Sequence, residues 1–125
     1  DFTATGNCTA YSDERLKDNI QTIDNALDKV SQMRGVTFTK DDAKGSGVIA
    51  QEIEKIAPEL VLDGEYKSVA YGNTVGYLIE AIKELKNTVV DLSLNIAEKL
   101  LSKELESKDK QLENIQEILD KTKLN

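Results

Sequence analysis

The C-terminal part of the chain restricts its folding most, because residues 78–125 contain no glycine, proline or aromatic residue. Mostly apolar residues there repeat in alternating steps of four and three, from Leu78 to Ile96 and again, after a step of five, from Leu101 to Thr122, where Lys108 and Thr122 are the polar members. This spacing is typical of a coiled-coil seam, and the longer step predicts a local change of supercoil or a bend. We therefore expect one helix, roughly 70 Å long at ~1.5 Å per residue, that packs on copies of itself or on its own folded-back half. The mixture of Leu, Ile and Val at the seam positions does not determine how many helices the coiled coil contains.

Residues 12–77 carry short patterns that predict a small mixed head before the long helix. The first expected elements are a helix over 20–33, capped by Asp18 or Asn19 and ended by Gly35, and a strand over 36–39. A polar loop over 40–47, a short strand over 48–50 and a helix over 51–57 that stops at Pro58 follow. The last are a hairpin over 60–71 with an Asp63-Gly64 turn and the start of the long helix at 72–74, with Asn73 or Thr74 as cap. A head of this size supports only a marginal core by itself. The sequence thus predicts an α+β fold with three parts: an extended segment over 1–11, the head over 12–77 and the helix over 78–125.

Composition excludes several function classes. The 16 Lys and Arg residues against 23 Asp and Glu residues give a net charge of -7, which argues against a nucleic-acid or anionic-membrane partner. No apolar run approaches the ~20 residues of a membrane span. With no histidine and one cysteine, the chain lacks the residues of a Ser-His-Asp or Cys-His site, of an internal disulfide and of an ordinary zinc site. We expect no metal and no cofactor.

Without histidine, one familiar route to nucleophilic catalysis remains, in which a lysine is the base for a serine. The candidate pair is Ser12 and Lys17. The pattern alone favours Ser12 as a helix N-cap, because two acidic residues follow it. Residues five apart differ by about 140° around a helix axis and point to opposite sides of a strand. A dyad therefore needs a turn between the two residues, or a lysine from another subunit.

Lys17 must also be neutral to accept a proton. Burial or a nearby cation such as Arg15 favours the neutral amine, whereas Asp13 and Glu14 oppose it if they face Lys17.

Three motifs, in order, carry a family resemblance. Residues 12–20 (Ser-Asp-Glu-Arg-Leu-Lys-Asp-Asn-Ile), residues 47–53 (Gly-Val-Ile-Ala-Gln-Glu-Ile) and residues 66–71 (Tyr-Lys-Ser-Val-Ala-Tyr), which lead into the apolar repeat at 78–85, resemble the auto-cleaving intramolecular chaperone domain of phage tail proteins. Domains of this family lie at the C-terminus of endosialidase tailspikes, neck appendages and L-shaped tail fibres. The resemblance covers residues 12–86.

The resemblance implies a fold, a partner and a reaction. It implies a homotrimer, formed as a coiled coil or helical bundle, that nucleates folding of the upstream fibre of the same chain and then cleaves the bond between Tyr11 and Ser12. It assigns Ser12 and Lys17 as a catalytic Ser-Lys dyad, and so favours nucleophile over N-cap for Ser12. Arg15 and Asn19 match the first motif, and Gln51 and Glu52 the second, in supporting or structural roles. It also implies a precursor of the virion tail or appendage, made in the bacterial cytoplasm, from which the chaperone is released.

The implied reaction occurs once in each chain. Ser12 Oγ attacks the carbonyl of Tyr11 while neutral Lys17 takes the hydroxyl proton, and the resulting ester is hydrolysed. Direct attack by water, assisted by the same pair, is the alternative route. The competing functions are a trimerisation module without protease activity and a coiled-coil adaptor for another protein.

Overall fold

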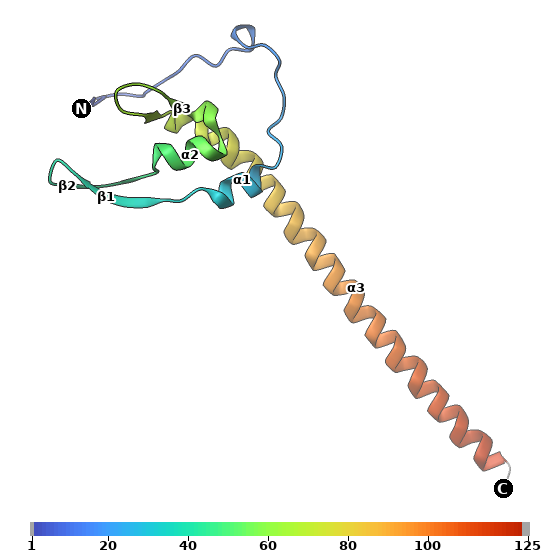
Figure 1. Ribbon diagram of the computed structural model, residues 1–125. Helices are drawn as coiled ribbons and strands as arrows, with labels where there is room; N and C mark the ends of the chain where they lie inside the picture. Colours follow the sequence, from blue (N-terminus) through green and yellow to red (C-terminus); the bar gives the residue numbers. More distant parts are fainter. Residues whose placement is uncertain (1, 124–125) are drawn as a thin grey trace.

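The computed structural model describes residues 2–123, in which a small head stands at one end of a single long helix (Figure 1). The elements are, in chain order, the 3₁₀ turn η1 (Glu14–Leu16), α1 (Ala26–Gln32), β1 (Val36–Lys40), β2 (Ala43–Gly47), α2 (Ala50–Ile56), the 3₁₀ turn η2 (Pro58–Leu60), β3 (Val61–Leu62), β4 (Ser68–Val69), the 3₁₀ turn η3 (Tyr71–Asn73) and α3 (Thr74–Lys123). The predicted fold class, a mixed α+β head followed by a long C-terminal helix, is confirmed.

Helix α3 runs for 50 residues without a break, which corresponds to about 75 Å at ~1.5 Å per residue. It continues as regular helix through residues 97–101, and Figure 1 shows no bend there. Its beginning agrees with the prediction, although the cap differs. The Thr74 hydroxyl donates to the Tyr71 carbonyl at 2.6 Å, so this side chain closes the preceding turn and does not accept an amide hydrogen as an N-cap would.

Helix α1 is shorter than the predicted helix over 20–33. The prediction that Asp18 or Asn19 caps it is wrong, because the helix begins only at Ala26, after two residues, Asn19 and Asn25, with φ of 54°. The reason lies far along the chain. The Glu84 carboxylate of α3 accepts hydrogen bonds from the amides of Ala26 at 3.1 Å and Leu27 at 2.9 Å. A tertiary contact thus satisfies the first free amides of α1 and fixes its start.

The C-terminal end of α1 also precedes the predicted one. The helix ends at Gln32, and Gly35 is not in the left-handed conformation that a glycine cap adopts.

Strands β1 and β2 form an antiparallel hairpin, in register from Val36 opposite Gly47 to Lys40 opposite Ala43. The prediction of strand β1 is confirmed. The prediction of a polar loop over 40–47 is wrong, because residues 43–47 form strand β2. Asp41 and Asp42 have φ of 50° and 60°, as a two-residue type I′ turn requires.

Glycines hide β2 from pattern analysis. Gly45 lies opposite Phe38, and a Cβ on Gly45 would stand 2.7 Å from Phe38 Cε2, so the aromatic ring covers the glycine. The strand predicted over 48–50 is absent, because residues 48 and 49 link the hairpin to α2.

The second hairpin follows α2, which ends just before Pro58 as predicted. Strands β3 and β4 pair antiparallel, as predicted for a hairpin. The predicted tight turn at Asp63-Gly64 is wrong, because five residues separate the two strands. Lys67 holds this loop, because its amine contacts Asp63 at 2.5 Å and Glu54 at 3.0 Å.

The core lies where α2, η2 and the start of α3 meet. The buried apolar side chains in residues 2–123 are Ala26, Ile53, Ala57, Leu60, Tyr77 and Ala81. Ile23, Val30 and Met33 pack around this cluster, which joins α1 to it. This core is small, as the sequence predicts for a head of this length.

Helix α3 presents two different stripes. The stripe that contacts α1 contains Tyr77 and Ala81, which are 4% and 5% exposed, together with the capping residue Glu84. The heptad seam lies beside it and is open to solvent: Leu78 is 45% exposed and Ile82 66%. The head therefore does not cover the seam.

Candidate functional site

Ser12 and Lys17 are in contact, with the one-turn element η1 between them. Lys17 Nζ lies 2.6 Å from Ser12 Oγ. The 3₁₀ turn is wound more tightly than an α-helix, and at Lys17 the backbone leaves it in an extended conformation, with φ of -126° and ψ of 138°. The turn that a contact between residues five apart requires is therefore present within one chain.

Asp13 fixes this turn from its N-terminal end. Its carboxylate accepts the Arg15 amide hydrogen at 2.9 Å, as an N-cap does, and the Lys17 amide donates to the Glu14 carbonyl at 3.0 Å. The N-cap residue is thus Asp13, which leaves the Ser12 hydroxyl free to face Lys17.

Arg15 pairs with Asp13 through two parallel hydrogen bonds. Arg15 Nε lies 3.0 Å from Oδ1 and Nη2 lies 2.7 Å from Oδ2. These bonds hold the pKa of Asp13 below its usual range and raise the pKa of Arg15. The Arg15 guanidinium and the Asp13 carboxylate therefore pair with each other and not with Lys17.

The first turn of the long helix faces the Ser12-Lys17 pair. A cleft of about 650 Å³ is lined by Ala10, Tyr11, Ser12 and Lys17 of the arm, the segment 2–25 that precedes α1, and by Gly72, Asn73, Val75 and Gly76 of η3 and α3. The residue before Ser12, the serine, the lysine and the start of α3 thus share one concave site.

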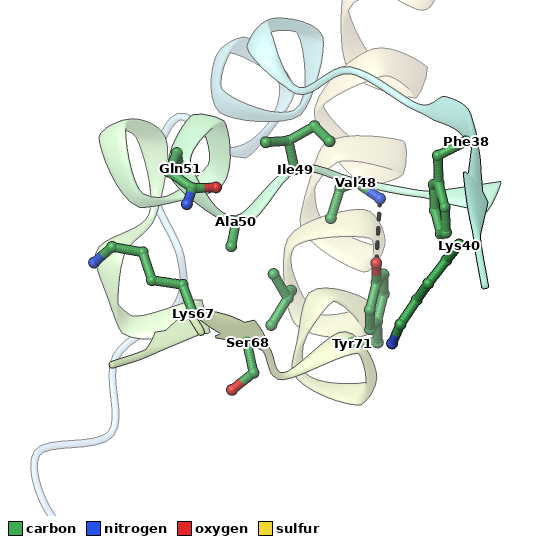
Figure 2. Close-up of a pocket in the computed structure, with 10 residues that line it drawn as sticks. Phe38, Lys40, Val48, Ile49, Ala50, Gln51, Lys67, Ser68 and Tyr71 are labelled. Atoms are coloured by element: carbon green, nitrogen blue, oxygen red, sulfur yellow. Dashed lines mark hydrogen bonds between the residues drawn. The ribbon is translucent and has the colours of Figure 1, made fainter. Parts of the chain in front are cut away.

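The other residues assigned by resemblance lie elsewhere in the single chain. Glu52 pairs with Arg34 at 2.9 Å, and its Oε2 atom is buried without a hydrogen-bond partner in the described structure. Gln51 lines a different pocket (Figure 2). Asn19 adopts a left-handed backbone two residues after Lys17, where the arm changes direction. In the single chain, the structure places Ser12, Lys17 and Tyr11 together and leaves Gln51 and Glu52 apart.

The pocket in Figure 2 explains why the second and third motifs occur together. Its volume is about 440 Å³, and it lies between β1, the start of α2 and β4. The Val48 amide donates to the Tyr71 hydroxyl at 3.2 Å, and a side chain on Gly47 would collide with that hydroxyl. Gly47 of the second motif therefore makes room for Tyr71 of the third.

Sequence reasoning did not identify the cleft wall formed by η3 and α3. The available signal was the pair of glycines four residues apart, Gly72 and Gly76, at the start of an otherwise glycine-free helix. Ile23 Cδ1 would stand 3.4 Å from a Cβ on Gly76, so this glycine also admits the arm side chain.

Over residues 2–123, no cluster of three His, Cys, Asp or Glu side chains is arranged to hold a metal ion. In the same part of the chain, no helix combines the length and apolarity needed to span a bilayer.

The fold and the site define a class of protein: a small α+β head on a long helix, with a serine and a lysine in contact on an extended arm. Residues 12–62 match the model of the family described as chaperone of endosialidase. The predicted resemblance to this family, whose model bears a peptidase name, is confirmed over that segment.

Two curated relatives are phage fibre proteins. The chain is 34% identical over 94 residues to the long tail fibre proteins Gp37 of Enterobacteria phages K3 and T2. The alignment covers 65% of this chain but only 8% and 7% of those proteins. The chain thus spans less than a tenth of the length of these relatives.

Proposed function

We propose that this domain trimerises through α3, guides the folding of a phage fibre that precedes it in the same chain, and then cleaves the Tyr11–Ser12 bond once. The observation that carries the cleavage is the 2.6 Å contact between Ser12 Oγ and Lys17 Nζ, beside Tyr11 in one cleft. The family description and the tail fibre relatives support the chaperone role. Residues 1–11 are then the end of the fibre, residues 12–77 the processing head and residues 78–125 the oligomerisation helix.

The cleavage begins with attack on the bond that precedes the nucleophile. Ser12 Oγ forms a bond to the Tyr11 carbonyl carbon, its proton passes to neutral Lys17 Nζ, and the carbonyl electron pair moves onto oxygen. When that oxyanion collapses, the bond from the Tyr11 carbon to the Ser12 nitrogen breaks and Lys17 returns the proton to the nitrogen. Water then hydrolyses the ester, which leaves a carboxylate on Tyr11 and a free amine on Ser12.

Two further copies of the chain are the partners that the seam of α3 fits. Its apolar side chains are about half exposed in the single chain, and α1 covers a different stripe. A face this long and apolar is stable in water when the seams of several helices pack together. A three-stranded bundle would also place three arms, each with its own Ser12 and Lys17, around one axis.

A helical trimer is well suited to start the folding of a fibre. Intertwined strands have non-local contacts and fold slowly, whereas helices form locally and fast. Linking three chains at one end raises their effective concentration and sets their register. Cleavage afterwards removes the template for refolding, so the fibre of the virion tail becomes kinetically stable. In this proposal the precursor is made in the host cytoplasm and the head and helix are released.

Expression of the fibre with and without this domain tests the chaperone role. An upstream fibre fragment is expressed alone, as one continuous chain with residues 1–125, and as the same continuous chain carrying Ser12→Ala. We expect soluble, trimeric fibre in the second and third cases, measured by sedimentation, and aggregated or monomeric fibre in the first. A fibre that is soluble and trimeric without residues 12–125 would contradict the chaperone role.

A further inference from the structure

The proposed cleavage leaves one requirement unmet, namely a hydrogen-bond donor for the oxygen that becomes negative on the Tyr11 carbonyl. A donor fixed at that position before the reaction is usually the largest single contribution to acyl-transfer catalysis. The Ser12-Lys17 pair does not supply it, because Ser12 forms the new bond and Lys17 carries the proton.

One side chain on the opposite wall of the cleft has the right chemistry. Among the eight residues that line the cleft, only Tyr11, Ser12, Lys17 and Asn73 have side chains that donate hydrogen bonds. The first three belong to the arm that reacts. Asn73 comes from η3, across the cleft, and its amide NH₂ is a neutral donor that does not compete with Lys17 for the proton.

The surroundings of Asn73 leave it available for this role. Its backbone amide is bonded to the Ala70 carbonyl at 3.0 Å, which anchors the residue in η3. Its side chain is exposed, and within residues 2–123 the structure gives it no hydrogen-bond partner. Gly72 beside it adds no bulk, because even a Cβ there would meet nothing within 4 Å. A peptide carbonyl therefore has room to approach Asn73.

We propose that the Asn73 side-chain amide donates a hydrogen bond to the Tyr11 carbonyl oxygen as Ser12 attacks it. This inference rests on the proposed self-cleavage and deepens it. The N–H bond of Asn73 remains intact throughout, since Asn73 stabilises charge and transfers no proton. Because Asn73 immediately precedes α3, the reactive site is complete only when the start of the oligomerisation helix has formed. Cleavage is thereby delayed until the helix that gathers the chains is in place.

The test is a single-turnover cleavage rate for the full chain with its upstream fibre. We expect Asn73→Ala and Asn73→Asp to cleave about 10²–10³-fold more slowly than the unchanged chain. Asp has the shape of Asn without its N–H donors, so it separates donation from packing. Asn73→His, which keeps a side-chain N–H, should recover part of the rate. Asn87→Ala, on an exposed part of α3, is the matched control and should cleave at the normal rate.

Two further measurements separate the possible failures. The trimer mass by sedimentation should be the same for every variant, and if Asn73→Ala loses the trimer, the near-isosteric Asn73→Asp carries the test. The pH dependence of the rate should keep its shape in Asn73→Ala, because Lys17 still accepts the proton. If Ser12 is required but both Asn73 variants cleave within threefold of normal, this inference is wrong and the cleavage stands. If the unchanged chain is not cut, or Ser12→Ala is cut, both proposals are wrong.

Discussion

At the residue scale, the candidate site depends on the local turn that Asp13 caps. The distance between Ser12 Oγ and Lys17 Nζ follows from how tightly η1 is wound, and η1 is held by the Asp13 carboxylate. The contact between Ser12 and Lys17 therefore depends on this neighbouring acid as well as on the two residues themselves.

Replacing that acid should slow cleavage without unfolding the head. We expect Asp13→Ala to reduce the single-turnover cleavage rate roughly 10–100-fold, because a displacement of about 1 Å in a reacting group has effects of this size. Asp18→Ala, an exposed acid beyond the turn, is the control and should cleave normally. Equal rates for Asp13→Ala and the unchanged chain would show that η1 does not position the dyad.

The same ion pair predicts a pH effect at the low end of the range. Arg15 holds the pKa of Asp13 below its usual ~3.9, so the folded turn is favoured above that pH. Its contribution is lost as the pH falls through the lowered pKa of the folded state. Amide exchange or NMR shifts of Arg15 and Lys17 should therefore report an intact η1 from neutral pH down to about 4 and a loosened one below it. Loosening that begins near neutral pH would contradict this assignment.

Gly47 offers a second residue-scale test, away from the dyad. Gly47→Ala should lower the free energy of unfolding by about 1–3 kcal/mol, because the new methyl group meets the Tyr71 hydroxyl. In a chain that already carries Tyr71→Phe the same change should cost less, since the colliding oxygen is gone. Urea unfolding of the unchanged chain, the two single variants and the double variant measures the coupling energy between Gly47 and Tyr71. Additive effects would mean that the glycine is needed for another reason.

At the element scale, local patterns predicted the elements that depend on local interactions. Strand β1 and α2 follow from alternation and from Pro58, and α3 follows from a heptad repeat without glycine or proline. The start of α1 was missed because its cap, Glu84, lies 58 residues away from Ala26. Strand β2 was missed because its side chains are small or polar and its apolar cover comes from Phe38 and Tyr71.

The candidate site divides in the same way. The identities of Ser12 and Lys17 came from the exclusion of histidine and from the family resemblance. Their contact depends on the cap of a three-residue turn, which periodicity does not reveal. The opposite wall, with Asn73, was not predicted because tertiary folding brings it to the arm, and the glycines at 72 and 76 do not by themselves indicate what they face.

The capping of α1 by Glu84 is directly testable. Glu84→Ala removes the acceptor for two amide hydrogens and should destabilise the head by about 1 kcal/mol. Glu98→Ala, further along the exposed part of α3, is the control and should change stability by a few tenths of that amount. Urea denaturation at one protein concentration provides the comparison, and equal effects of the two changes would exclude the tertiary cap.

A lysine in the apolar seam of α3 provides a test of the proposed trimer. Lys108 occupies a seam position between Leu105 and Leu112, and a single charged residue in a coiled-coil core costs stability while fixing register. Lys108→Leu should therefore raise the thermal midpoint of the trimer, whereas Lys103→Leu, outside the seam, should not. A midpoint that falls or stays unchanged for Lys108→Leu would argue that this seam is not the packed face.

At the scale of the whole molecule, the single chain leaves much apolar surface uncovered. Residues 2–22 of the arm are exposed throughout, the head buries few side chains, and the seam of α3 faces solvent over its whole length. In the proposed function, trimerisation would cover the seam and the upstream fibre would continue from the N-terminal end of the arm. The proposed cleavage site would then lie between the fibre and the trimeric helices.

The most direct test of self-processing is the intact mass, under denaturing conditions, of the chain expressed with its upstream fibre. We predict two masses that differ in sum from the uncut chain by one water molecule and whose boundary lies between Tyr11 and Ser12. The Ser12→Ala and Lys17→Ala variants should each give one uncut mass and remain trimeric before denaturation. A single uncut mass for the unchanged chain, or a cut that persists in Ser12→Ala, would contradict the proposed cleavage.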